Sequence, residues 1–337
     1  MSGTRASWTR GTRWTVAVAA TALLAGACSS YNPAGGGSAS PGTEASGGNP
    51  YATSPPPPPK GVAATIEAGE HPCTVEAGEG SVWVSDLRRD VVKRVDPSSN
   101  QIVKEIKVGG RPCSLALGAG SLWVGNIDGA SVMRIDPESG RIVATIGLQS
   151  PGGISVAFGS VWVGSANPNQ LVRIDPATNK IAQVFHPSPS PGGAAPGFGS
   201  LWVPDGGENL IVRMDPSGNV QARIPVGPAP GGVAFSEDRV WVTNSASGQL
   251  QSIDPATNRV VGKVAVGRRP GGVVLDHGLL WVANFNDDTV SKVDPATGKL
   301  VGEVETDSGP GALASGFGSV WVATFYGGTL LRLNPTG

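Results

Sequence analysis

Side chains that could carry out acid–base, nucleophilic or metal chemistry are sparse in this sequence. Histidine occurs at only three positions, His71, His186 and His277. No zinc-ligand spacing, phosphate-binding loop or G-x-S-x-G nucleophile motif is present. We therefore expect no catalytic set, no metal site and no cofactor.

Side chains suited to ligand binding lie instead on both sides of a series of regularly spaced tryptophans. Asparagines and aromatic residues follow the Trp by three to five positions, and arginines directly precede a proline upstream of it. Such groups suit a polar small molecule, a glycan or a peptide, although each is equally common as a solvated surface residue. The candidate binding residues are Arg111, Asn126, Asn244, Arg268, Arg269, Asn284, Phe285, Phe325 and Tyr326.

The elements that must position these residues are set by a strict repeat. Tryptophan recurs at intervals of 39 or 40 residues, at positions 83, 123, 162, 202, 241, 281 and 321. A Pro lies eleven residues before each Trp, and a second Pro, preceded by Asp or Asn, lies fourteen residues after it. A fixed period of this length indicates one supersecondary unit used seven times.

Each repeat has the pattern of four short strands. In the second repeat, apolar and β-branched residues alternate over 113–117, 121–125, 131–136 and 141–148, with Gly, Asx-Pro and Ser-Gly turns between them. About forty residues with four strands, repeated seven times, predicts an all-β, seven-bladed β-propeller over residues 61–337. The last repeat lacks its fourth strand, and 63–69 has the form of that strand, so we expect an N-terminal strand to close the ring.

This strand assignment places the candidate residues on one face of the ring. Arg268, Arg269, Asn284, Phe285, Phe325 and Tyr326 fall in loops of blades six and seven, so we expect them to be neighbours, with the aromatic rings exposed. His71 and His186 belong to blades nearly opposite each other on the ring, and His277 belongs to the other face. The three histidines are therefore not expected to share a metal ion.

The residues that repeat in every blade are better explained by folding than by catalysis. A Trp in each second strand can fill the wedge between blades, and burying roughly 200 Å² contributes about 5 kcal/mol before ordering costs. The Asx-Pro pairs can start turns, and small residues after the leading Pro suit a crowded innermost strand. A basic residue two positions before the Asx in six repeats, such as Arg134, predicts a solvated strand face or a bridge between blades.

Two cysteines, Cys73 and Cys113, occupy equivalent positions in adjacent repeats. An exported protein can form a disulfide there if the Cα atoms approach within about 7 Å. Two small buried thiols are an equally good interpretation of the same positions.

The first 60 residues have the pattern of an export signal followed by a tether. Residues 1–27 combine three arginines and no acid with a 14-residue apolar run, which is too short to span a bilayer but is typical of a secretory signal peptide. Cys28 follows in "LLAGACSS", which resembles the lipobox of bacterial lipoproteins and implies lipidation of Cys28. Residues 28–60 are rich in Gly, Ser and Pro and predict a tether, which would hold the protein at the outer face of the cytoplasmic membrane.

The charge balance excludes partners that need a strongly basic surface. Without residues 1–27 the chain has 22 basic and 26 acidic side chains, a net charge of −4. Nucleic-acid-binding domains usually carry a clear basic excess. We expect a monomer that contacts the membrane only through its lipid, does not bind nucleic acid, and recognises a polar small molecule, glycan, peptide or envelope protein.

The segments "WVGN" (123–126), "WVTN" (241–244) and "WVAN" (281–284), with "RIDP", "SIDPATN" and "KVDPATG" downstream, resemble the YVTN or YncE-like propeller repeat. The resemblance covers residues 61–337 and implies an exported seven-bladed propeller that works as a binding or scaffold module. It identifies the fold and leaves the activity open.

The chain resembles more distantly the streptogramin B (virginiamycin B) lyases. That resemblance implies a propeller that opens a cyclic depsipeptide by elimination, with a His base and a magnesium ion. No counterpart of the family's His and Glu cluster can be placed in this sequence. We therefore expect a recognition or scaffold protein, and keep a lyase or hydrolase of a cyclic peptide or lactone as the alternative.

Overall fold

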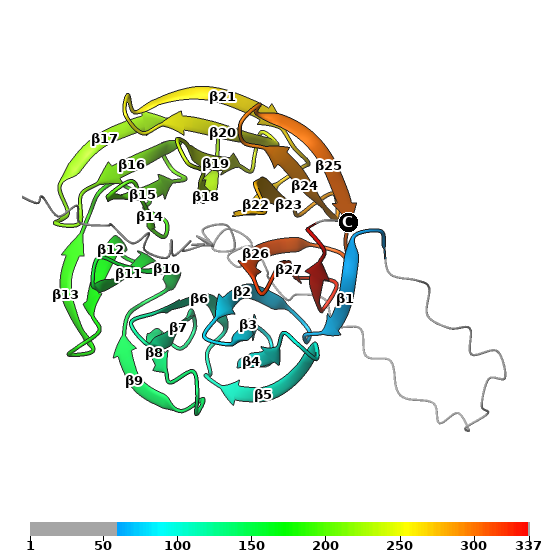
Figure 1. The fold of residues 1–337 in the computed structure, drawn as a ribbon. Coiled ribbons are helices and arrows are strands. Elements are labelled where there is room, and N and C mark those ends of the chain that lie inside the picture. The colour runs from blue at the N-terminus through cyan, green and yellow to red at the C-terminus, as the bar shows by residue number, and fades with distance from the viewer. Residues whose placement is uncertain (1–58, 336–337) are drawn as a thin grey trace, which may run out of the picture.

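The computed structural model describes residues 59–335, which form a ring of seven four-stranded antiparallel sheets (Figure 1). The predicted all-β propeller with seven blades is thereby confirmed. The signal peptide at 1–27, the lipidation site Cys28 and the tether up to residue 58 lie outside the described residues. Residues 59–335 contain no helix long and apolar enough to cross a membrane.

Blades one to six each consist of four strands that follow one another in the chain. Blade one consists of β2 Pro72–Gly78, β3 Ser81–Asp86, β4 Val91–Asp96 and β5 Gln101–Lys107. Blade two consists of β6 Pro112–Gly118, β7 Ser121–Asn126, β8 Ser131–Ile135 and β9 Ile142–Gly147. Blade three consists of β10 Pro151–Ala157, β11 Ser160–Ala166, β12 Asn169–Asp175 and β13 Lys180–Phe185. Blade four consists of β14 Ala195–Gly197, β15 Ser200–Asp205, β16 Leu210–Met214 and β17 Val220–Pro225. Blade five consists of β18 Pro230–Phe235, β19 Val240–Asn244, β20 Gln249–Asp254 and β21 Arg259–Ala265. Blade six consists of β22 Pro270–Asp276, β23 Leu279–Asn284, β24 Thr289–Asp294 and β25 Lys299–Glu305.

The seventh blade is assembled from both ends of the described chain. It consists of β26 Pro310–Gly316, β27 Ser319–Thr324 and β28 Thr329–Leu333, with β1 Val62–Glu67 as the outermost strand. β1 pairs antiparallel with β28, from Val62 opposite Leu333 to Glu67 opposite Thr329. The predicted closure by an N-terminal strand is confirmed, and β1 covers the edge of β28 that would otherwise be open at the junction of the ring.

Two faces of the ring are distinguished by their connections. The loop face carries the connections from second to third strands and those that lead into first strands, and the turn face carries the other hairpin turns. Because Val62 lies opposite Leu333, at the turn-face end of β28, the chain comes into β1 from the turn face. The backbone N–H of Asn334 donates to the carbonyl of Gly61 there, at 2.9 Å.

The repeated tryptophans pack between neighbouring blades, as predicted. All seven are 3% exposed or less. Trp202 of blade four, for example, lies in one apolar cluster with Val233, Val240 and Val242 of blade five. The sheets are therefore held together by apolar burial at each interface, which is the main stabilising contribution in a fold without helices.

In blades one, two, four and seven the arginine two positions before the Asx forms a bridge to the next blade. The guanidinium of Arg134 lies 5.2 Å from the ring centre of Trp123 in its own blade. Its Nη1 donates to the carbonyl of Pro176 at 2.6 Å and to Oδ1 of Asn179 at 3.0 Å, both in the turn of blade three. Arg213 and Arg332 repeat this arrangement toward the turns of blades five and one.

The innermost strands approach one another closely around the axis. A Cβ atom added to Gly271 of blade six would lie 2.9 Å from the carbonyl oxygen of Gly311 in blade seven. A larger side chain at this position would push two blades apart, because backbone atoms cannot yield as a flexible side chain does. The predicted crowding after the leading Pro is confirmed at Gly271.

Candidate ligand-binding site

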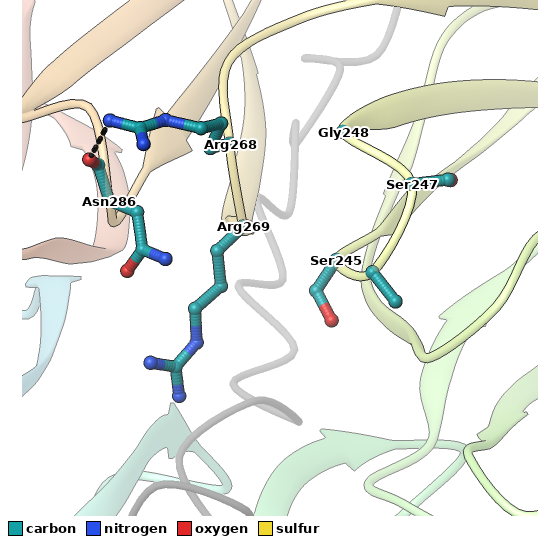
Figure 2. A pocket seen from close by; sticks show the side chains of 7 residues that line it. Ser245, Ser247, Gly248, Arg268, Arg269 and Asn286 are labelled. Atoms are coloured by element: carbon teal, nitrogen blue, oxygen red, sulfur yellow. Dashed lines mark hydrogen bonds between the residues drawn. The ribbon is translucent and has the colours of Figure 1, made fainter.

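A pocket of about 500 Å³ opens between blades five and six on the loop face (Figure 2). One wall is the loop between β19 and β20, and the other comes from the loops before β22 and after β23. None of the lining residues is acidic. They are Ser245, Ala246, Ser247, Gly248, Arg268, Arg269 and Asn286.

Arg268 is paired with groups of its own blade. Its Nε donates to Oδ1 of Asp287 and its Nη2 donates to the carbonyl of Asn286 at 2.9 Å. The backbone N–H of Arg268 donates to Oδ2 of Asp287 at 2.5 Å. This backbone hydrogen bond, followed by the one from the Arg268 side chain, lowers the pKa of Asp287, so its negative charge offsets the charge of Arg268.

Arg269 is held in a different way. Its guanidinium lies over the ring of Phe285, with Cζ 4.7 Å from the ring centre. Within residues 59–335 its side chain has no hydrogen bond and no ion pair. Figure 2 shows it extending away from Arg268, on the side of the pocket opposite Ser245 and Ser247. Stacking on an aromatic face uses the plane of a guanidinium and leaves its N–H edge able to bind a ligand.

An aromatic cluster adjoins Arg269 on the side of blades seven and one. The cluster consists of His71, Phe285, Phe325 and Tyr326, with ring centres 4.6 Å apart for His71 and Phe325, 5.5 Å for Phe285 and Tyr326, and 5.2 Å for Phe325 and Tyr326. The structure therefore brings together five predicted residues, Arg268, Arg269, Phe285, Phe325 and Tyr326. Of the aromatic rings, only Tyr326 is strongly exposed, at 63%. The expectation that Phe285 is exposed is wrong, because Arg269 and the neighbouring rings cover it and leave 8% accessible.

The disulfide of the described chain lies beneath this cluster. Cys73 of β2 and Cys113 of β6 are bonded to each other, with their Cα atoms 5.2 Å apart. They form one small apolar cluster with Leu87 and Phe285. The innermost strands of blades one and two are thus joined covalently, close to the rings that border the pocket.

His71 joins the cluster, although no sequence pattern places it beside these rings. Its backbone N–H donates to Oδ1 of Asp86 at 3.3 Å, and its Nδ1 is buried with no hydrogen-bond partner among the described residues. Burial, and then the positive charge of Arg88, lowers the pKa of His71. The imidazole is therefore neutral at pH 7.

The three predicted asparagines do not present their side chains to a ligand. Asn126, Asn244 and Asn284 are fully buried. Oδ1 of Asn284 accepts the backbone N–H of Gly267 at 3.0 Å, and its Nδ2 donates to Oγ of Ser291 at 2.8 Å. Their expected place on the exposed rim is wrong. The amide of Asn284 fastens the loop that leads into β22, whereas Oδ1 of Asn126 and of Asn244 is buried without a hydrogen-bond partner among the described residues.

Asp86 and Asp205 hold the same structural position in blades one and four. Asp86 accepts the backbone N–H groups of Glu70 and Arg88, and Asp205 accepts those of Ser190 and Gly207. The same position therefore fastens the preceding loop in blades one, four and six.

The remaining candidate, Arg111, lies away from the pocket. Its Nη1 pairs with Oδ1 of Asp128 at 3.4 Å, within the loops of blade two. His186 and His277 are also separate from the cluster, since Nδ1 of His186 lies 3.2 Å from the carbonyl of Asn169 and Nδ1 of His277 lies 2.6 Å from Asp276. No group of three or more His, Cys, Asp and Glu side chains within residues 59–335 is placed to hold a metal ion.

Comparison with known proteins reveals the same architecture. A family described as outer membrane protein assembly factor BamB matches residues 207–337, which is less than half of the chain. No curated protein matches the sequence. One similar solved structure is a streptogramin B lyase, with a TM-score of 0.71 and 18% identity, over 79% of this chain and 94% of that chain.

Two further structures have a TM-score of 0.70. Hydrazine synthase of Kuenenia stuttgartiensis is 15% identical over 82% of this chain and 98% of that chain. A catalytically inactive virginiamycin B lyase from Staphylococcus aureus with quinupristin is 17% identical over 79% of this chain and 96% of that chain. At these identities the similarity establishes a shared propeller fold.

Proposed function

We propose that this protein is an exported, lipid-anchored propeller that binds a polar ligand on its loop face. The binding site is the pocket between blades five and six together with the aromatic cluster beside it. The observation that carries the proposal is the placement of Arg269, whose guanidinium stacks on Phe285 and borders the pocket without a charged partner in residues 59–335. A stacked, unpaired arginine next to an exposed aromatic ring is typical of recognition surfaces.

The direction of the chain supports an anchored arrangement. Residues 59–61 lead into β1 from the turn face, which is opposite the pocket. A tether over 28–60, with a mean reach of roughly 30 Å, would attach the propeller to the membrane by the turn face and direct the pocket outward. Growth with labelled palmitate tests the anchor: label should enter the wild-type protein and be absent from Cys28→Ala.

A lyase acting on a cyclic peptide or lactone is the second candidate function. It is favoured by the fold shared with streptogramin B lyase and by the neutral His71 in the aromatic cluster. The described residues do not fit the magnesium ion that this resemblance implies, because they contain no suitable group of metal-binding side chains. Incubation with a streptogramin B and Mg²⁺ distinguishes the two functions. A linearised product would demonstrate lyase activity and refute the proposal that the protein only binds its ligand.

The binding role is tested by screening the full-length protein against sugar acids, short oligosaccharides and N-acetylated amino acids. Tyr326→Ala should weaken the best ligand at least tenfold, because Tyr326 is the exposed ring of the site. Phe317→Ala is the matched control, since Phe317 is 40% exposed in a hairpin turn on the turn face. Equal affinities of wild type and Tyr326→Ala would refute the proposed site.

A further inference from the structure

The charges around the pocket distinguish its two arginines. Arg268 forms an ion pair with Asp287, whose lowered pKa keeps it ionised. Arg269 has no acidic partner within residues 59–335, and none of the lining residues is acidic. The pocket therefore has one uncompensated positive charge, which favours an anion as ligand.

The geometry of Arg269 selects the shape of that anion. Its guanidinium plane lies against Phe285, so the donors that remain are those along the edge of the fork. Two parallel N–H groups in a plane match a carboxylate or one edge of a phosphate.

The backbone of the pocket argues against a phosphate. Phosphate sites usually add several free backbone N–H groups or a second arginine to the first. Here the N–H groups of Ser245, Ala246 and Ser247 already donate to the carbonyls of Ala229, Pro228 and Asn244. The N–H of Asn286 likewise donates to the carbonyl of Arg268. One available guanidinium without such a nest fits a group with a single negative charge.

The serine hydroxyls and the aromatic cluster indicate which other chemical groups the ligand carries. Oγ of Ser245 donates to the carbonyl of Ala229, and Oγ of Ser247 donates to that of Asn244. Their remaining lone pairs can accept a hydrogen bond from the ligand. On the other side of Arg269, Phe285 contacts Tyr326, which offers an exposed ring for an apolar or flat body.

From these contacts we infer that the ligand is a carboxylic acid. Its carboxylate binds the edge of Arg269, a hydroxyl or amide N–H of the ligand donates to Ser245 or Ser247, and its apolar body covers Tyr326. This inference rests on the proposed binding function and specifies the chemistry of that same site.

The test compares N-acetylphenylalanine with its neutral amide, because the pair differs only in the charged group. Dissociation constants for both, and for inorganic phosphate, are measured by NMR titration of the full-length protein. We expect the acid to bind at least tenfold more tightly than the amide and than phosphate. Arg269→Gln should raise the dissociation constant of the acid at least tenfold. Arg269→Lys should restore only part of the lost affinity, because a lysine cannot bind a carboxylate bidentately.

Arg239→Gln, in the hairpin turn between β18 and β19 on the turn face, is the matched control and should change the affinity for the acid less than threefold. The inference is overturned if the acid and the amide bind equally, if phosphate binds more tightly, or if the two glutamine variants are weakened alike. Equal binding of the acid and the amide that is lost for both in Tyr326→Ala would overturn the carboxylate and leave the proposed site intact. Absence of binding by all three probes would overturn the inference itself.

Discussion

Replacing Glu76 by Gln should stabilise the protein at neutral and alkaline pH. Glu76 lies on β2 directly opposite Trp83, so its side chain shares the face that packs against blade two. The corresponding positions in blades two and seven hold Ala116 and Ala314. Burial raises the pKa of the Glu76 carboxyl from an ordinary 4.5 to about 8. Blade one therefore carries a titratable group at an interface position that is occupied by alanine in blades two and seven.

The direction of the effect follows from proton binding. Between pH 4.5 and pH 8 the folded protein keeps Glu76 protonated while the unfolded chain ionises it, so the unfolded state is favoured as the pH rises. The contribution of Glu76 to stability is complete below pH 4.5 and is lost by pH 8. At about 1.4 kcal/mol per pKa unit, the loss is about 3 kcal/mol at pH 7 and about 5 kcal/mol above pH 8.

Glutamine has nearly the same shape as the protonated carboxyl and does not titrate. For a domain of this size about 2 °C of melting temperature corresponds to 1 kcal/mol, so Glu76→Gln should melt about 10 °C above the wild type at pH 8.5 and nearly with it at pH 4.5. The assay is thermal unfolding by near-ultraviolet circular dichroism from pH 4.5 to 9. Glu67→Gln, at an exposed carboxyl of β1, is the control and should follow the wild type. Parallel pH profiles of wild type and Glu76→Gln would refute the assignment of a buried, protonated carboxyl.

Three further predictions concern the scaffold. Arg134→Ala should lower the free energy of unfolding by about 2–3 kcal/mol in denaturant titrations, because it removes the stacking on Trp123 and the charged hydrogen bonds to blade three; an unchanged midpoint would contradict the bridge. Phe158→Asn should raise the unfolding free energy by about 0.5–1 kcal/mol, because Phe158 is 46% exposed in a turn at φ 53°, where Asn is favoured; a destabilised variant would show that the ring has a packing role. A thiol assay under denaturing, non-reducing conditions should detect neither Cys73 nor Cys113, which are bonded to each other, and two reactive thiols at these positions would contradict the disulfide.

The candidate site shows where inference from the sequence is reliable. Arg268, Arg269, Phe325 and Tyr326 could be placed together because the repeat assigns each to a numbered blade and to one face. Asn284 was misjudged because an amide at the end of a strand has the same sequence pattern whether it faces solvent or fastens a loop. Ser245 and the other small polar lining residues were missed because Ser, Gly and Asn in a loop are typical of any turn.

The ring could be predicted from the repeat alone: its seven blades, their four strands and the closure by β1. Seven copies report the same local preferences, so strand alternation, turn residues and the buried Trp agree at every repeat. Which of two adjacent arginines has an available guanidinium becomes known only from the folded structure. That difference depends on whether the side chain meets Asp287 or the ring of Phe285, and it arises from side-chain directions that no local pattern encodes.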